Sequence, residues 1–191
     1  MNWLSKKFGI DGRPSKTFAI STYAEMKHNG SVKFQFVDSC EPGYRWIFPI
    51  SDETANVGVC VLANKPQANL RLLGDELLKD NTAYPLGRWR GGWGPIWSGL
   101  GQCWHHSSGI ISCGDAAGLI NPYSGEGITA ALKSGEQAGN AVVKFLLEDR
   151  NPIKLQQYSD WIIDYFSNQY KLSPLLQTWS NYCGISNEKT Y

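Results

Sequence analysis

The chain has 191 residues, which is long enough to bury a sizeable core, so a minimal disulfide-stapled scaffold is excluded. Lys and Arg number 18 against 17 Asp and Glu, and a formal charge of +1 gives no indication of nucleic-acid binding. Charged residues make up only 18% of the chain and aromatic residues 13%, which excludes an intrinsically disordered segment.

The cysteines and the apolar runs of the sequence indicate the cellular compartment in which the protein is expected. Five cysteines form an odd set with no CxxC pair and no zinc-ligand spacing, so neither a disulfide framework nor a metal site is expected. Cys60 and Cys113 lie in apolar runs and are expected to be buried, inert thiols. The N-terminus has no signal-peptide pattern, and no run of about eighteen apolar residues occurs. We therefore expect a cytoplasmic protein, with peripheral contact to a membrane left open.

The N-terminal third of the chain has the two-residue alternation of half-buried strands. Turn signals at Gly30 and Pro42 separate these strands. We expect an antiparallel meander of about four strands, formed by segments 17–24, 31–38, 44–49 and 55–62. A short helix is expected over 70–79, followed by a Gly- and Trp-rich segment, 84–104, which we interpret as an irregular loop packed over a cavity.

The remainder of the chain changes character at Gly109. The short apolar run 109–113 is typical of a strand buried on both faces of a sheet. Helical spacing then predicts one long helix over 126–148 and two further helices over 153–171 and 174–183.

The strongest chemical signal lies between this strand and the long helix. The sequence there reads Gly114-Asp115-Ala116-Ala117-Gly118, followed by Gly125-Glu126-Gly127. Small residues let the backbone approach a flat or phosphorylated ligand, and the Asp115 carboxylate can accept hydrogen bonds from sugar hydroxyls. The helix N-terminus near Gly127 and Ile128 suits negative charge on a ligand carbonyl oxygen. The alternative is that Gly114 and Asp115 only turn the chain and cap a helix.

Two segments carry a resemblance to a known family. Residues 110–142 resemble the second flavin-binding segment of the flavoprotein monooxygenase-like superfamily, and especially of its geranylgeranyl reductase family. The stretch from Pro42 to Pro49 reads PGYRWIFP and matches the P-x-Y-x-W-x-F-P motif of geranylgeranyl reductases at every fixed position. The resemblance extends over about residues 8–150 and implies the C-terminal portion of such an FAD-dependent oxidoreductase.

The resemblance implies a cofactor, a substrate and their residues, but no catalytic side chain. The cofactor is FAD, reduced by NADPH or another electron donor, and the substrate is an isoprenoid or another apolar small molecule. Tyr44, Trp46 and Phe48 share one face of their strand and would face the substrate; the alternative is that this face is ordinary core. The residues implied in FAD binding are Gly114, Asp115, Ala116, Gly118, Pro122, Gly125, Gly127 and Ile128.

The same resemblance predicts the fold class and the domains. We expect an α/β protein, or α+β as a fragment, with an antiparallel substrate-domain sheet and the last strand and helix of a Rossmann-like FAD domain. Residues 1–105 would form the sheet with its short helix and Trp- and Gly-rich loop. Residues 106–150 would be the C-terminal part of the FAD-binding domain, and 151–191 a helical tail.

One family feature is missing from these residues. The chain has no GxGxxG fingerprint for the cofactor pyrophosphate. Segment 9–15 resembles the family stretch that precedes the substrate sheet, so we expect the chain to begin about halfway through the family. A complementary chain carrying the GxGxxG half is one implied partner.

Three functions are therefore considered. The first is a geranylgeranyl-type reductase that transfers hydride from flavin to isoprenoid C=C bonds, complete only with the GxGxxG half. The second is a non-catalytic remnant, or an apolar-ligand-binding partner subunit of a split flavoenzyme. The third is a flavin-dependent hydroxylase or halogenase, which the P-x-Y-x-W-x-F-P match disfavours.

Overall fold

The computed structural model describes residues 16–40, 43–61, 69–99, 104–105 and 109–171. The chain divides into two compact units, one formed by Thr17–Trp93 and one built mainly from Gly94 onward. The last predicted helix, 174–183, lies outside the described residues.

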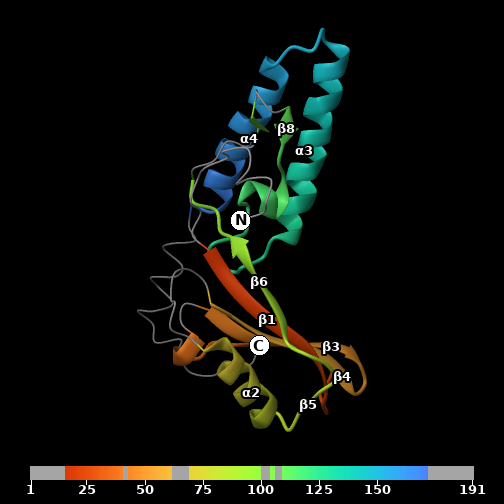
Figure 1. The fold of residues 1–191 in the computed structure, drawn as a ribbon, viewed down its shortest axis with the longest axis vertical. Helices are drawn as coiled ribbons and strands as arrows, with labels where there is room; N and C mark the ends of the chain where they lie inside the picture. The colour runs from red at the N-terminus through yellow and green to blue at the C-terminus, as the bar shows by residue number, and fades with distance from the viewer. Residues whose placement is uncertain (1–15, 41–42, 62–68, 100–103, 106–108, 172–191) are drawn as a thin grey trace. The chain divides into compact units, whose positions relative to one another are not determined.

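The first unit is built on an antiparallel sheet, as predicted (Figure 1). Its strands follow the order β2-β3-β4-β1-β5, and β6 also pairs with β1. The expected simple meander holds only for β2 to β4, because β1 lies beside β4 instead of beside β2. Alternation along a strand specifies its faces but not its neighbours, which explains this error. The bounds are β1 Lys16–Glu25, β2 Lys33–Gln35, β3 Gly43–Ser51, β4 Thr54–Val61, β5 Tyr84–Pro85 and β6 Arg90–Pro95.

The helix α2 (Leu70–Asp80) confirms the predicted short helix and packs on one face of this sheet. Its buried leucines, among them Leu73 and Leu77, share one core with β-strand residues such as Ile47 and Val57. Arg45 points to the same side. Its buried guanidinium forms ion pairs with Asp80 at 3.1 Å and Glu76 at 3.5 Å, which join β3 to α2.

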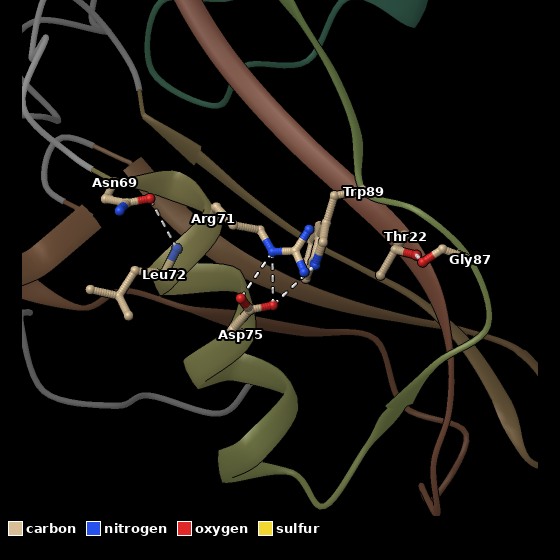
Figure 2. A network of polar contacts seen from close by, with 7 residues as sticks. All are labelled: Thr22, Asn69, Arg71, Leu72, Asp75, Gly87 and Trp89. Carbon is tan, nitrogen blue, oxygen red and sulfur yellow. Dashed lines mark hydrogen bonds and ion pairs between the residues drawn. The ribbon is translucent and has the colours of Figure 1, made fainter.

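A second set of polar contacts fixes the chain that follows α2. Figure 2 shows Asp75 accepting hydrogen bonds from both Arg71 Nε and Trp89 Nε1, the latter at 3.2 Å. The Trp89 ring lies against Gly74, where a Cβ atom would come within 2.7 Å of it. Thr22 Oγ1 on β1 also donates to the Gly87 carbonyl at 3.3 Å. These contacts hold segment 84–93 against the sheet unit.

The prediction of an irregular loop over 84–104 was therefore wrong for Tyr84–Pro85, which forms β5, and for Arg90–Pro95, which forms β6. The reason for β6 lies in Gly91. A Cβ atom there would lie 2.4 Å from the Ala19 carbonyl oxygen and 2.6 Å from Ile20 Cγ2, so β6 can approach β1 only without a side chain. A glycine that usually weakens a strand allows close backbone approach here.

The second unit contains two long helices, α3 (Ile128–Leu147) and α4 (Ile153–Gln169), which confirm the predicted helices and pack side by side (Figure 1). Their core combines small residues of α3, such as Ala138, with Tyr158, Ile162 and Phe166 of α4. Tyr158 donates a hydrogen bond to the Ser112 carbonyl at 2.8 Å and so connects α4 to the segment that precedes Gly114.

The strand predicted over 109–113 is shorter and less buried than expected. It forms β8 (Ile110–Ile111), which pairs antiparallel with β7 (Trp104–His105). Both isoleucines are only half-buried, and Ile111 lines a pocket of about 320 Å³. Cys113 is exposed, so the prediction that its thiol is buried was wrong, whereas Cys60 is buried as predicted.

Replacing Gly91 with Ala should destabilise the sheet unit by about 1–3 kcal/mol, because the new methyl group would collide with the backbone of β1. Gly92→Ala is the matched control: no atom lies within 4 Å of a Cβ at that position. We expect the control to change the free energy of unfolding by less than about 0.5 kcal/mol. Urea unfolding of both variants measures the difference, and equal losses would contradict the assigned β6–β1 contact.

Candidate functional site

Tyr44, Trp46 and Phe48 lie on the sheet face opposite α2. In the β3–β4 ladder they pair with Cys60, Gly58 and Asn56 respectively, and directly paired residues point to the same face. Arg45 and Ile47 alternate with them and point to the core. The structure therefore brings the three predicted substrate residues together on the face that α2 leaves open.

Two phenylalanines outside the predicted set join the three rings. The Phe34 centroid lies 5.4 Å from that of Tyr44 and 5.3 Å from that of Phe48, both edge to face. Phe36 contacts Tyr44 with centroids 5.9 Å apart. The alternation of apolar and polar residues in segment 31–38 was the signal for them. We call these five rings, Phe34, Phe36, Tyr44, Trp46 and Phe48, the aromatic face.

Trp46 is held flat on the sheet by its two neighbours on β4. A Cβ atom at Gly58 would lie 2.0 Å from Trp46 Cζ2, so the indole occupies the space that any other residue would fill. Its Nε1–H donates to Asn56 Oδ1 at 2.8 Å, which satisfies the polar atom of the ring. Tyr44 and Phe48 flank the indole at centroid distances of 6.1 and 6.0 Å. The ring is therefore positioned before any ligand is present.

The aromatic face is uncharged at neutral pH. Burial raises the pKa of the Tyr44 phenol well above its usual value, with the neighbouring Cys60 contributing in the same direction. Burial also raises the pKa of the Cys60 thiol, to about 11. Both groups keep their protons near pH 7, so this surface suits an apolar ligand and not an anion.

The second predicted site surrounds the short 3₁₀ helix η2 (Gly114–Ala117). Gly114 has a φ of +53° and lies against α3, where its Cβ would come 3.0 Å from the Ala131 Cβ. Its N–H donates to the buried Ser134 Oγ at 2.9 Å. The exposed Asp115 carboxylate lies beside Gly127, at 2.9 Å from the position of a Cβ there. Asp115 therefore lies at the N-terminus of α3, and no side chain at position 127 separates them.

Part of the donor capacity of the α3 N-terminus is already used. Glu126 Oε1 accepts a hydrogen bond from the Thr129 N–H at 2.6 Å. The Ile128 and Ala130 amides also belong to the first turn and have no acceptor within the helix. The sequence did not predict this capping bond, because the side chains that usually accept from the first helical amides are those of Ser, Thr, Asp and Asn.

The other predicted cofactor residues line the turn that leads into α3. Ala116 is exposed, and Gly118 ends η2 with a φ of +71°. Pro122 and Gly125 belong to a closed loop in which the Asn121 N–H donates to the Glu126 carbonyl at 2.8 Å. Ile128 is 76% exposed. These small or exposed residues leave the backbone accessible to a ligand.

The described residues offer neither a metal site nor a membrane-spanning helix. They contain no group of three or more His, Cys, Asp and Glu side chains that could hold a metal ion. Over the same part of the chain, no helix is both long and apolar enough to cross a membrane.

The fold is similar to part of the fold of solved FAD-dependent oxidoreductases. A geranylgeranyl bacteriochlorophyll reductase-like protein from Thermoplasma acidophilum aligns with a TM-score of 0.75 and 21% identity, over 92% of this chain and 46% of that one. A probable FAD-dependent monooxygenase from Pseudomonas aeruginosa aligns with a TM-score of 0.62 and 17% identity, over 96% of this chain and 53% of that one. The antiparallel sheet and its three described helices, α2, α3 and α4, thus form part of an FAD-dependent oxidoreductase fold.

Relatives found by sequence similarity point to one group of reductases within this fold. Digeranylgeranylglycerophospholipid reductase 3 of Methanosphaera stadtmanae is 31% identical over 157 residues, 78% of this chain and 38% of the relative. A digeranylgeranylglycerophospholipid reductase of Methanocaldococcus jannaschii is 32% identical over 158 residues, 78% of this chain and 37% of the relative. No family model matches the chain. The chain is a partial homologue of the geranylgeranyl reductase family and spans less than two fifths of the length of these relatives.

The burial of the cysteines predicts their reactivity. At pH 8 Cys113 should be alkylated rapidly, because it is exposed, whereas Cys60 should react at least about tenfold more slowly. Because the pKa of Cys60 is about 11, its thiol stays protonated at pH 8. The reactive thiolate forms only as the pH approaches 11. Peptide mass spectrometry after a short iodoacetamide pulse separates the two sites. Equal labelling of Cys60 and Cys113 in the folded chain would show that β4 is not buried as described.

Proposed function

We propose that the chain is the substrate-binding and partial flavin-binding portion of a geranylgeranyl-type reductase, which reduces isoprenoid C=C bonds. The observation that carries this proposal is the aromatic face, five contacting rings on the sheet side that α2 does not cover. Tyr44, Trp46 and Phe48 are the fixed aromatic positions of the P-x-Y-x-W-x-F-P motif. The names of the relatives, digeranylgeranylglycerophospholipid reductases, support the same substrate class.

An isoprenoid chain fits the aromatic face because both are apolar, elongated and uncharged. The free energy gained by apolar contact is roughly proportional to the area removed from water. Flat rings provide that area with little loss of side-chain entropy. The polar groups of the rings are the Trp46 indole N–H, which donates to Asn56, and the Tyr44 phenol, whose raised pKa keeps it neutral. Trp46 is fixed by Gly58 and Asn56, so little ordering accompanies binding.

The residues around η2 and the α3 N-terminus fit an FAD molecule. Asp115 is exposed and would accept hydrogen bonds from hydroxyl groups next to the isoalloxazine, while Gly114, Ala116 and Gly118 allow close backbone approach. The Ile128 amide would face negative charge on the flavin ring. Pro122, Gly125 and Gly127 complete the proposed set. When bound, FAD supplies the hydride chemistry, with NADPH or another donor as the source of electrons.

The pyrophosphate of FAD would be bound outside these 191 residues, because they contain no GxGxxG sequence. We propose that this region, on the same or on a complementary polypeptide, packs on α3. Residues three or four apart on α3 form an open stripe that includes Ile128, Leu132, Gly135 and Gly139. The side chains of Ile128 and Leu132 are 76% and 71% exposed. A Cβ atom at Gly135 or Gly139 would meet no atom within 4 Å. Such a stripe permits close packing against a sheet.

The alternative functions make different predictions for the assembled protein. A non-catalytic remnant would bind an isoprenoid on the aromatic face without reducing it. A flavin-dependent halogenase or hydroxylase, the classes of other solved structures with this fold, would oxidise an aromatic substrate. The P-x-Y-x-W-x-F-P match favours the reductase.

The open stripe on α3 predicts self-association of the 191-residue chain. We expect oligomers in sedimentation velocity at micromolar concentration and binding of an apolar dye, because an uncovered apolar surface drives association. Leu132→Glu should shift the distribution toward monomer. Leu72→Glu is the matched control, since Leu72 on α2 is also 54% exposed. A chain that stays monomeric at every concentration would contradict the assignment of this stripe as a packing surface.

The two proposed ligand sites should respond separately to mutation once the GxGxxG region is supplied by fusion or in trans. Asp115→Ala should weaken FAD binding by about 1.5–3 kcal/mol, the value of a hydrogen bond to a charged group. Trp46→Ala should leave FAD affinity unchanged and lower isoprenoid turnover at saturating flavin, because it removes apolar wall area only. Flavin titration and product analysis measure the two effects.

Two results would contradict the assignment of Asp115 to the cofactor and of Trp46 to the substrate. If Asp115→Ala leaves the flavin titration unchanged, the carboxylate does not contact the cofactor. If Trp46→Ala weakens flavin binding as much as turnover, the aromatic face is not a separate substrate surface. Isoprenoid binding without reduction in the flavin-loaded assembly would favour the non-catalytic alternative.

A further inference from the structure

The sequence contains one Asn-Gly dipeptide, Asn29-Gly30, which lies in the connection between β1 and β2. Such a dipeptide between two strands usually forms the tight turn of a hairpin. Here β1 lies beside β4 and β2 lies beside β3, so the two strands that the dipeptide connects do not pair with each other. Asn29-Gly30 therefore does not serve as a hairpin turn.

Two hydrogen bonds organise this connection around the Asn29 side chain. The Gly30 N–H donates to His28 Nδ1 at 3.2 Å. The Ser31 N–H donates to Asn29 Oδ1 at 3.1 Å. A ring nitrogen that accepts a hydrogen bond carries no proton, so the proton of the neutral His28 ring is on Nε2. The amide that follows Asn29 thus has a base at its hydrogen, and the side-chain carbonyl of Asn29 has a donor at its oxygen.

The same atoms are open to solvent. Asn29, Gly30 and Ser31 are exposed, and residues 28–30 line an open pocket of about 540 Å³. Gly30 has a φ of +79°, and a Cβ atom at this position would meet no other atom within 4 Å. Because glycine has no side chain, nothing on residue 30 hinders the approach of its nitrogen to the side chain of Asn29. Water can also reach the site.

We propose that Asn29 is a site of self-catalysed deamidation, with the Gly30 nitrogen as the nucleophile and His28 as the general base. An amide nitrogen is a weak nucleophile until its proton is removed, and His28 Nδ1 already lies at that proton. The attacked carbon, Asn29 Cγ, belongs to the carbonyl that the Ser31 N–H polarises. The reaction uses this chain's own residues and water, and it is independent of flavin and isoprenoid binding.

The atoms balance over two steps. His28 Nδ1 takes the Gly30 amide proton as the nitrogen forms a bond to Asn29 Cγ, and the Ser31 N–H stabilises the negative charge that develops on Oδ1. The bond between Cγ and Nδ2 then breaks, and Nδ2 takes the proton back from His28 and leaves as ammonia. One water molecule opens the five-membered succinimide ring at either of its two carbonyls. The products are aspartate and isoaspartate at position 29.

The modification changes the segment that leads to the aromatic face. It adds one negative charge to the pocket, which Asp52, the other titratable side chain of its lining besides His28, also lines. Isoaspartate also places one additional carbon in the backbone between β1 and β2. Because β2 carries Phe34, this change lies in the connection that positions one of the five rings.

The test is incubation of the 191-residue chain at pH 8, followed by peptide mass spectrometry and labelling with an isoaspartate-specific methyltransferase. We expect Asn29 to be converted, and His28→Ala and His28→Gln each to lower the rate at least about tenfold, because both variants remove the base. The Gln oxygen can still accept from the Gly30 N–H. A low rate in His28→Gln therefore reflects the missing base and not a missing hydrogen bond.

The dependence of the rate on pH separates catalysis by His28 from a structural role. In His28→Gln hydroxide is the remaining base, so the rate should rise about tenfold for each pH unit between pH 7 and pH 9. The parent chain should show a shallower rise, because its neutral imidazole supplies the base. Equal slopes in the two proteins would overturn the role of His28.

Two controls test the other atoms of the site. Ser31→Ala keeps the backbone N–H and should leave the rate unchanged. Asn56 should stay unmodified in the same digest, because its side chain accepts from Trp46 and donates to the Thr22 carbonyl. The proposal is overturned if Asn29 stays intact, if His28→Gln reacts as fast as the parent chain, or if the parent chain unfolded in urea reacts as fast as the folded chain. Thermal unfolding verifies that each variant is folded.

Discussion

The sheet unit depends on the alternation of side chains along β3. Arg45 and Ile47 point to α2, and Tyr44, Trp46 and Phe48 point to the opposite side. A shift of one residue would exchange these sets and place a guanidinium on the open face. Among the described residues, the carboxylate partners of Arg45 are Glu76 and Asp80, and both lie on α2. The two ion pairs therefore select which face of the sheet becomes core.

An uncovered face of large rings would normally destabilise a small unit, and the packing of the rings reduces that cost. Each of the five rings contacts at least one other in tilted, edge-to-face or stacked geometry, which removes part of their area from water. Gly58 lets the Trp46 indole lie on the backbone of β4. The rings are thus half-buried, and their remaining area is available to a ligand.

The sequence was sufficient to predict elements that depend on local periodicity, such as β3, β4, α2, α3 and α4. It was not sufficient to predict which strands pair, because pairing depends on residues far apart in the chain. The position of β1 beside β4 depends on which strand edges meet, and alternation carries no such information. The strand β6 was missed because glycine reads as a breaker, whereas Gly91 is required by the approach to Ala19.

The same distinction applies to the candidate sites. The shared face of Tyr44, Trp46 and Phe48 follows from their spacing alone. The ring contacts of Phe34 and Phe36 require the β2–β3 pairing, which places Phe34 opposite Trp46. The proximity of Asp115 to Gly127 depends on how η2 folds back on α3. The exposure of Cys113 could not be predicted, because an apolar run of five residues does not show which of them ends the strand.

Selectivity for an isoprenoid on such a surface has to come from shape and from the ends of the ligand. Apolar contact has no direction, so five rings distinguish ligands by length and width and not by functional group. The polar atoms that border the rings are mostly satisfied within the protein, as Asn56 shows by accepting from Trp46 and donating to the Thr22 carbonyl. The aromatic face therefore supplies affinity for the apolar chain, and recognition of a polar head group has to come from residues outside these five rings.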